Sequence, residues 1–153
     1  MPDSAPKPRN IHGTAILIGE HGVLIIGPSG AGKTTLALAL VDHCQMRGLF
    51  SRMIGDDQLF AACHAGRLVC HAPTTIAGLA EVPGIGPRSL PSERAGLIDL
   101  TVRLVQAGEM TRFQGEATET IAGCQLPRVD VVRQNVTAAL PVVMARLSIP
   151  PFS

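Results

Sequence analysis

The residues best suited to chemistry form one glycine-rich stretch: Gly27, Pro28, Ser29, Gly30, Ala31, Gly32, Lys33 and Thr34. It matches the phosphate-binding pattern Gly-x-x-x-x-Gly-Lys-Ser/Thr, in which backbone N–H groups converge on phosphate oxygens. The lysine of such a loop reaches the β- and γ-phosphates of a nucleoside triphosphate, and the next hydroxyl binds Mg²⁺. The stretch therefore predicts nucleoside triphosphate binding through Lys33 and Thr34.

Acidic residues at two further places could complete this chemistry. Asp56 and Asp57 follow a predicted strand over residues 50–54, and phosphoryl transfer needs a carboxylate that orients or deprotonates the attacking hydroxyl. Neighbours on a strand point to opposite sides, so at most one of the pair faces the phosphates. Glu81 lies in an apolar context, and the residues alone leave two interpretations open: a Mg²⁺ ligand or a solvated strand residue.

The elements around the loop are those that a phosphate-binding loop requires. An apolar run over residues 23–26 predicts a strand before it, and residues 35–41 begin a helix that we expect to reach about residue 46 and to end at Gly48. Leu36, Ala37, Leu40 and Val41 form the buried stripe of that helix. The helix N-terminus adds partial positive charge at the phosphates.

The remaining pattern predicts more strands than helices. We expect hairpins over residues 14–26 and 58–71, a strand over 97–105, an edge strand over 126–132, and loops over 88–95 and 106–120. Asn135 caps a terminal helix to residue 147, in which Pro141 marks either a kink or the first turn. The predicted fold is α/β: a single P-loop domain over residues 11–149 with a mixed, hairpin-rich sheet, and tails at 1–10 (disordered) and 150–153.

Composition excludes several classes of protein. The chain has 153 residues, is 46% hydrophobic and carries a formal net charge of +1, which gives no case for binding nucleic acid or an anionic membrane. No apolar run approaches the roughly 18 residues of a transmembrane helix, and the polar N-terminus is unlike a signal peptide. The four cysteines fit free thiols in a reducing cytoplasm, with Cys44 and Cys124 as packing residues. The pairs Cys63-His64 and Cys70-His71 could suggest zinc ligands, but their spacing fits no common zinc motif, so buried thiols are the favoured interpretation.

Four elements in a fixed order resemble the C-terminal catalytic domain of HPr kinase/phosphorylase, the bacterial enzyme that acts on a serine of the phosphocarrier protein HPr. They are His12-Gly13, the loop over residues 27–34, Gly55-Asp56-Asp57, and the stretch over residues 79–86. The resemblance runs from about Ile11 to about Asn135. A P-loop alone is common to many unrelated enzymes, but the four together are specific.

The resemblance implies roles for individual residues. His12, Lys33 and Asp57 would belong to the active centre, with Asp57 accepting the serine proton in the forward reaction and returning one in the reverse reaction. Thr34 and Glu81 would be the Mg²⁺ ligands. Arg112 is similar to the family's catalytic arginine, and Arg103 and Arg94 are the alternatives.

The resemblance also implies the cofactors ATP and Mg²⁺, HPr as protein partner, a cytoplasmic location and a hexamer. The start of the chain is similar to the short alphaproteobacterial type, which lacks the N-terminal domain. Pro83 stands where the family has an arginine, and residues 127–135 diverge, so kinase activity is favoured over the reverse phosphorylase activity. Two alternatives stay open: a small-molecule P-loop kinase, and a non-catalytic ATP-binding sensor.

Overall fold

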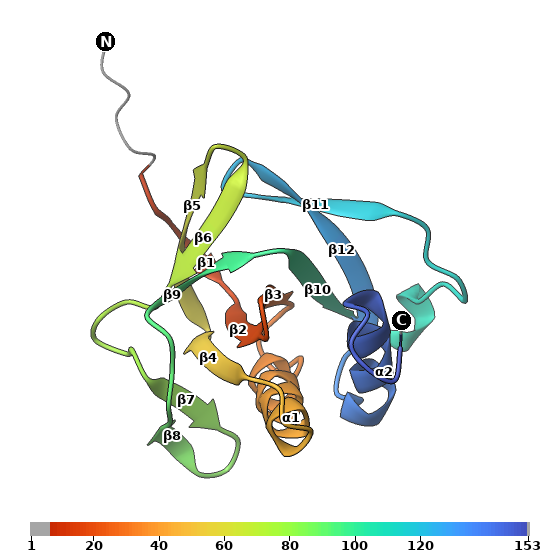
Figure 1. The fold of residues 1–153 in the computed structure, drawn as a ribbon, viewed down its shortest axis with the longest axis horizontal. Helices are drawn as coiled ribbons and strands as arrows, with labels where there is room; N and C mark the ends of the chain where they lie inside the picture. The colour runs from red at the N-terminus through yellow and green to blue at the C-terminus, as the bar shows by residue number, and fades with distance from the viewer. Residues whose placement is uncertain (1–6, 153) are drawn as a thin grey trace.

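The computed structural model describes residues 7–152, whose elements follow one another around a central sheet (Figure 1). The chain forms β1 (Arg9–His12), β2 (Thr14–Ile18), β3 (His21–Ile26), α1 (Lys33–Met46), β4 (Ser51–Gly55), β5 (Gln58–His64), β6 (Arg67–His71), β7 (Leu79–Val82), β8 (Gly86–Ser89), β9 (Ala95–Ile98), β10 (Leu100–Val105), the 3₁₀ turn η1 (Ala107–Glu109), β11 (Ala117–Ile121), β12 (Cys124–Val132) and α2 (Val136–Arg146).

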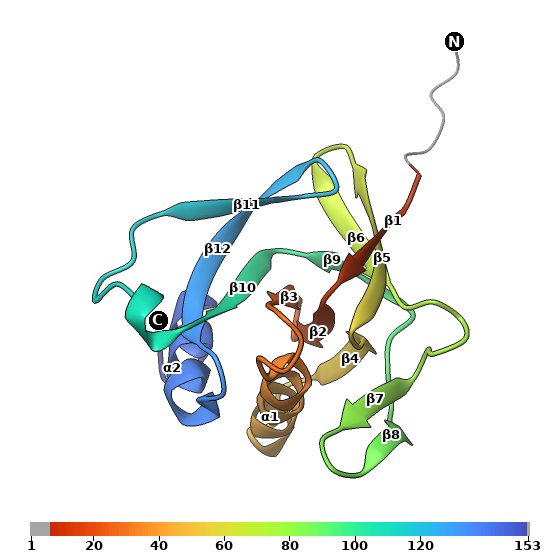
Figure 2. The ribbon, with the colours of Figure 1, turned by 180° about the vertical axis from the view of Figure 1, so that it is seen from behind.

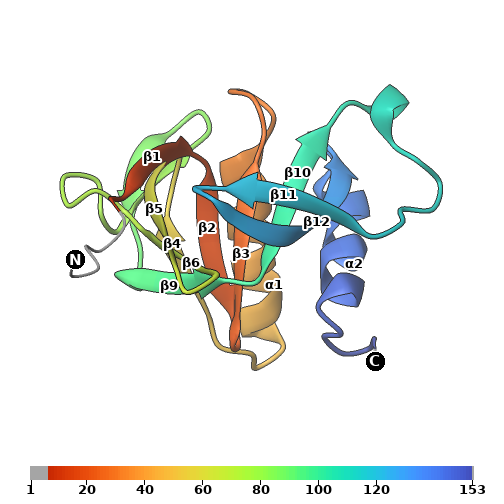
Figure 3. The same ribbon diagram turned by 90° about the horizontal axis from the view of Figure 1, so that it is seen from above.

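The central sheet has six strands in the order β11-β12-β10-β3-β2-β4. β3, β10 and β12 run parallel, and the other pairings in this sheet are antiparallel. Both helices cover one face, while the four-stranded antiparallel sheet β1-β5-β6-β9 lies on the opposite side (Figures 2 and 3). β7 and β8 form a separate hairpin beside α1. The parallel strands therefore bring their carboxyl ends together at the edge where the glycine-rich loop begins.

Two apolar cores explain these layers. One packs the central sheet against α1 and α2, with Leu36, Leu40 and Val143 among its buried residues. The other fills the space between the two sheets, with Leu24 and Leu59 among them. Because side chains alternate along β3, the strand contributes to both cores and is fixed from both sides.

Most of the predicted elements around the loop are confirmed. The hairpin β2–β3, the helix α1 and its buried stripe, β4 and the hairpin β5–β6 occur where expected. Gly48 has φ of 77° and donates to Gln45, which ends α1 as predicted. The α/β class with a mixed sheet is therefore confirmed.

Residues 97–105 form strand as predicted except at Asp99, but they belong to two strands rather than one, because the chain changes sheets there. β9 pairs with β6 in the small sheet, whereas β10 pairs with β3 and β12 in the central sheet. The Asp99 carboxylate accepts a hydrogen bond from Gly22 N at 3.0 Å, and Asp99 N donates to Gly22 O at 2.8 Å. Ile98 consequently lies in the core between the sheets, and Leu100 lies in the core under the helices.

Two segments that we predicted as loops contain strands, because their backbone groups pair with a neighbouring strand although their side chains are polar. Arg88 and Ser89 belong to β8, and the polar stretch 117–121 forms β11. β11 is the edge strand on this side of the central sheet, so the expectation that residues 126–132 form an edge is also wrong. Pro127, which suggested an edge, lies just before β12 begins to pair with β10 at Arg128, so its missing N–H interrupts no bond on that side.

The chain ends also differ in detail from expectation. Arg9 and Asn10, expected in a disordered tail, form β1 against β5, while residues 1–6 of that tail lie outside the described residues. Asn135 caps α2 as predicted by accepting from Ala138 N at 3.2 Å. Pro141 lies inside α2, beyond its first turn. No helix among residues 7–152 is long and apolar enough to span a membrane.

The prediction of four free thiols is wrong, because Cys63 and Cys124 form a disulfide. The bond joins β5 in the small sheet to β12 in the central sheet. The sequence hides this pair, since its members lie 61 residues apart and only the packing of the two sheets brings them together. Cys44 and Cys70 are free and buried, and burial raises the pKa of Cys70 to about 12. The four cysteines therefore do not support the predicted reducing compartment as free thiols would, since two of them are bonded to each other.

We expect the disulfide to stabilise the fold. Replacing Cys63 with serine should lower the free energy of unfolding by about 2–4 kcal/mol, because the cross-link restricts the unfolded chain. Urea unfolding with and without dithiothreitol measures this: the reductant should destabilise the wild-type chain and leave Cys63→Ser unchanged. Equal stability of oxidised and reduced wild-type protein would contradict the prediction.

Candidate active site

The glycine-rich loop connects the end of β3 to the start of α1, as a phosphate-binding loop must. Gly30 and Gly32 have φ of 81° and 97°, a left-handed conformation that glycine adopts without strain. The Lys33 ammonium donates to Gly27 O at 2.9 Å and Pro28 O at 3.3 Å, and only 7% of the residue is exposed. The loop thus holds a buried positive charge beside its own backbone at the helix N-terminus, where anions are favoured.

Asp56 is the central acceptor of the site, although the sequence singled out its neighbour. It is 6% exposed and accepts three hydrogen bonds: from Thr34 Oγ1 at 2.6 Å, from Thr14 Oγ1 at 2.8 Å and from Glu81 N at 2.8 Å. These donors come from α1, β2 and β7. Asp56 therefore couples the loop hydroxyl to a neighbouring strand and to the β7–β8 hairpin.

We expect Asp56→Asn to destabilise the chain by about 2–3 kcal/mol, because an amide offers one acceptor oxygen where three donors converge. Chemical denaturation measures the loss. Asp57→Asn is the matched control at the next, exposed position, where a change within about 0.5 kcal/mol is expected. Equal stability of the two variants would show that the Asp56 network contributes nothing to folding.

Asp57 is exposed and has φ of 65°, which turns its side chain out of the strand direction. Gly13 N donates to Asp57 O at 3.0 Å, and Asp57 N donates to Thr14 Oγ1 at 3.3 Å. Asp tolerates the left-handed region better than most residues, and these two bonds hold it there. The adjacent carboxylates are thereby separated: Asp56 is buried in the network and Asp57 faces the solvent-accessible site.

Two pockets meet at Asp57 and Glu81. The first, of about 490 Å³, is lined by loop residues together with Pro83 and Gln134; its loop residues are Ser29, Gly30, Gly32, Lys33, Thr34 and Thr35. The second, of about 590 Å³, lies towards the β5 side and is lined in part by Phe60, Ile76 and Leu79. Asp57 and Glu81 line both. One carboxylate can therefore reach a phosphate in the first pocket and a group entering from the second.

The oxygen donors at this junction fit a magnesium ion. The Thr34 hydroxyl and the Glu81 carboxylate belong to residues lining the first pocket, and both residues are linked to Asp56. Mg²⁺ is held by one or two carboxylates completed by substrate phosphates and water, so a dedicated protein cage is not required. Among the described residues no group of three or more His, Cys, Asp or Glu side chains forms such a cage.

The other predicted residues lie at varying distances from this junction. His12 is the last residue of β1 and pairs with Gln58, the residue that follows Asp57 in the chain. His12 lines neither pocket. Arg112 is exposed after η1, with its guanidinium 5.4 Å from the Phe113 ring centroid, and it too lines neither pocket. Arg94 is exposed, and Arg103 lines a third pocket beside Gly27. The structure therefore brings Lys33, Thr34, Asp57 and Glu81 together, but none of the three arginines joins them.

Gln134 is a site residue that the sequence did not indicate. Its side-chain amide donates to Gly30 O at 2.5 Å, its backbone N donates to Ala31 O at 3.1 Å, and it lines the first pocket. With φ of 57° it directs the chain from β12 onto the loop. No local pattern marks this residue, because its contact with the loop spans 104 positions.

A strand, a glycine-rich loop with a buried lysine, and a helix whose first hydroxyl donates to a buried aspartate lie together in a mixed α/β fold. The family model described as "HPr Serine kinase C-terminal domain" matches residues 4–139. The chain belongs to this family, as the motifs had indicated.

Individual relatives agree with this assignment. The chain is 33% identical over 139 residues to the HPr kinase/phosphorylase of Limosilactobacillus reuteri, covering 83% of this chain and 41% of that protein. It is 35% identical over 88 residues to the HPr kinase/phosphorylase of Clostridium tetani, covering 58% of this chain and 27% of that protein. The chain thus spans less than half the length of these two relatives.

A solved structure shares most of the fold. The Hpr(Ser) kinase/phosphatase from Coxiella burnetii superposes with a TM-score of 0.73 at 26% sequence identity. The match covers 91% of this chain and 97% of that one. The layers described above are therefore those of a known kinase/phosphatase fold.

Proposed function

We propose that this chain is a Mg²⁺- and ATP-dependent protein serine kinase that phosphorylates a seryl hydroxyl of the phosphocarrier HPr, in the cytoplasm. One observation carries the proposal: Asp57 lies where the pocket of the glycine-rich loop meets a second pocket of about 590 Å³. A kinase needs such a junction, because donor and acceptor must approach one general base from different sides. The family and its named relatives support the choice of acceptor.

In this proposal each residue of the junction has one role. Lys33 and the loop amides bind the β- and γ-phosphates, and Thr34 and Glu81 hold Mg²⁺, which neutralises phosphate charge. Asp57 accepts the proton of the seryl hydroxyl while the serine oxygen attacks the γ-phosphorus and the bond to ADP breaks. Asp56 positions Thr34 and the backbone of Glu81 through the bonds described above.

The forward direction is favoured over phosphorolysis. Pro83 lines the loop pocket, and its side chain offers neither charge nor hydrogen-bond donor there. Position 83 therefore contributes no donor to the inorganic phosphate that the reverse reaction needs as substrate, and Lys33 and the loop amides remain its only donors in this proposal. The proposal therefore assigns kinase activity to this chain and gives the reverse activity a minor part.

The test is transfer of phosphate from Mg·ATP to HPr from the same cell, read by intact-mass spectrometry. One added phosphate on a serine, lost in the Asp57→Asn variant, would support the kinase. ATP binding without transfer to HPr would favour the sensor alternative, and transfer to a metabolite would favour the small-molecule kinase. Failure of the chain to bind ATP would reject all three.

A further inference from the structure

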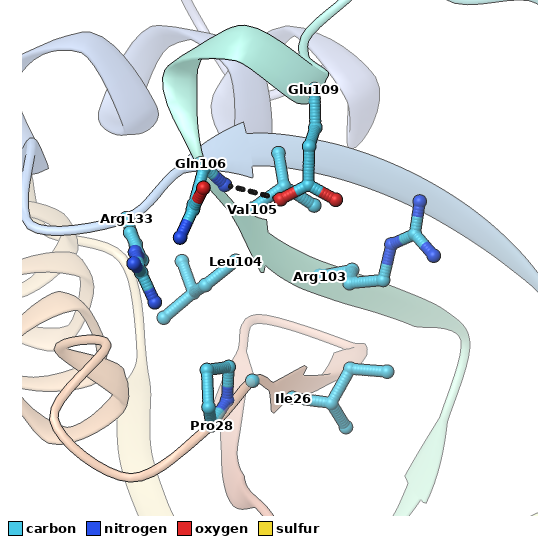
Figure 4. Close-up of a pocket in the computed structure, with 9 residues that line it drawn as sticks. Ile26, Pro28, Arg103, Leu104, Val105, Gln106, Glu109 and Arg133 are labelled. Carbon is cyan, nitrogen blue, oxygen red and sulfur yellow. Dashed lines mark hydrogen bonds between the residues drawn. The ribbon is translucent and has the colours of Figure 1, made fainter.

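A pocket of about 360 Å³ beside the glycine-rich loop has no role in the phosphate chemistry described so far (Figure 4). It lies where β3 and β10 end and where the chain leaves β12, and its walls include Ile26, Leu104, Val105 and Arg133. Open sheets bind ligands outside the carboxyl ends of their parallel strands. This pocket therefore occupies the part of the sheet edge that the phosphate and acceptor pockets leave unused.

The pocket adjoins the phosphate pocket along two chain segments. Gly27 and Pro28 line it, while Ser29 and Gly30 line the phosphate pocket. In the same way, Arg133 lines this pocket and the next residue, Gln134, lines the phosphate pocket. A Cβ atom on Gly27 would lie only 3.0 Å from Leu104 Cβ, so this glycine lets the loop start directly against the pocket wall. A ligand can thus extend from one pocket into the other.

The lining suits a flat heterocycle. Leu104 and Val105 are 4% and 5% exposed and, with Pro28 and Ile26, give the pocket apolar walls. Figure 4 shows the Gln106 amide, the Arg133 guanidinium and the Glu109 carboxylate around those walls. One oxygen of the Glu109 carboxylate accepts a hydrogen bond from Gln106 N at 3.0 Å, which fixes these two residues relative to each other at the start of η1. An apolar site with a few polar groups of mixed type is typical of small-molecule recognition, and the pocket volume lies at the lower end of the usual range of roughly 300–1,000 Å³.

The charges do not favour a simple anion. Arg103 binds Asp130 through two bonds of 2.8 and 3.1 Å, and this hydrogen bonding raises the pKa of Arg103. Its charge is therefore already compensated. Among the described residues Arg133 takes part in no ion pair, so its positive charge could attract an anion. The Glu109 carboxylate lines the same pocket, however, and would repel an anionic ligand. Groups of both signs suit the donors and acceptors along the edge of a nucleobase.

We propose that this pocket binds the purine base and ribose of the nucleotide whose phosphates occupy the glycine-rich loop, with Gln106 and Arg133 as the residues that recognise the base. The inference rests on the proposed function, because it needs a nucleoside triphosphate in the loop. It adds a second binding region, built by β10, η1 and the segment after β12, that sets the affinity for the nucleoside rather than for phosphate.

The first test compares ATP with inorganic tripolyphosphate, both with Mg²⁺, by titration calorimetry. We expect the wild-type chain to bind ATP about 10-fold more tightly than tripolyphosphate, and the double variant Gln106→Ala, Arg133→Ala to lose that advantage while binding tripolyphosphate within about twofold of wild type. Arg146→Ala removes an exposed arginine from the end of α2 and serves as the matched control. Unchanged ATP affinity in the double variant would overturn the inference.

The second test uses wild-type protein, so it does not depend on the folding of a variant. Photolysis with 8-azido-ATP should label residues 103–109 or Arg133, as mapped by mass spectrometry. Labelling of the β7–β8 hairpin instead would overturn the base pocket while leaving nucleotide binding intact. If neither ATP nor tripolyphosphate bound at all, the proposed function itself would fail, and the inference with it.

Discussion

Asp57→Asn should lower the rate of phosphate transfer by about 10²–10⁴-fold, the range expected when a general base is removed. The carboxylate lies where the two pockets meet, and an amide cannot accept the seryl proton. Asparagine is the informative substitution, because it tolerates the φ of 65° that the position requires, whereas alanine would add backbone strain. Single-turnover transfer to HPr, followed by intact-mass spectrometry, gives the rate.

Asp42→Asn makes the same change on the exposed face of α1 and should leave the rate unchanged. Affinity for Mg·ATP should be unchanged or tighter in Asp57→Asn, because the change removes a negative charge near the phosphates. Transfer at the wild-type rate by Asp57→Asn would exclude this residue as the base. Loss of ATP binding together with transfer would instead assign Asp57 to nucleotide binding.

Lys33→Met should reduce transfer by roughly 10²–10³-fold, as removal of one preorganised charge from a phosphoryl-transfer site does. The ammonium is held by the carbonyl oxygens of Gly27 and Pro28, at the mouth of the loop. Methionine keeps the apolar stem and removes the charge, so the loop loses its contact with the transferring phosphoryl group. Quenched single-turnover assays at saturating ATP separate a slower transfer step from weaker ATP binding.

The chain's other lysine, Lys7, is exposed and provides the matched control Lys7→Met. The free energy of unfolding should change little in Lys33→Met, since the loss of two hydrogen bonds to Gly27 O and Pro28 O is offset by the removal of a charge from a buried position. Transfer of phosphate by Lys33→Met as fast as by Lys7→Met would contradict the role given to Lys33.

Local sequence patterns predicted the elements that carry the loop. An apolar strand, glycines at positions needing positive φ and a helix with a regular buried stripe are short-range signals, and β3, the loop and α1 occur as expected. Patterns failed where partners far along the chain decide the structure. β11 is polar yet pairs with β12, and Arg128 binds Glu119 across that pair at 3.2 Å.

The candidate site divides in the same manner. Lys33, Thr34, Asp57 and Glu81 were named from the sequence and lie around one pocket. The hydrogen-bond network of Asp56 is visible only in the tertiary structure, because its donors come from β2, α1 and β7, up to 42 residues away. Gln134 and the pocket beside Gly27 depend on the parallel pairing of β10 and β12, which periodicity alone does not reveal.

The sequence by itself thus determined the glycine-rich loop between a strand and a helix, and the family, since these depend on residue types at short, fixed spacings. Only the tertiary structure decided that the chain changes sheets at Asp99, that Cys63 joins Cys124, and that Asp56 and Asp57 face different surroundings. The physical reason is that burial, sheet pairing and hydrogen-bond satisfaction are settled between distant segments, which compete for partners only once the chain has folded.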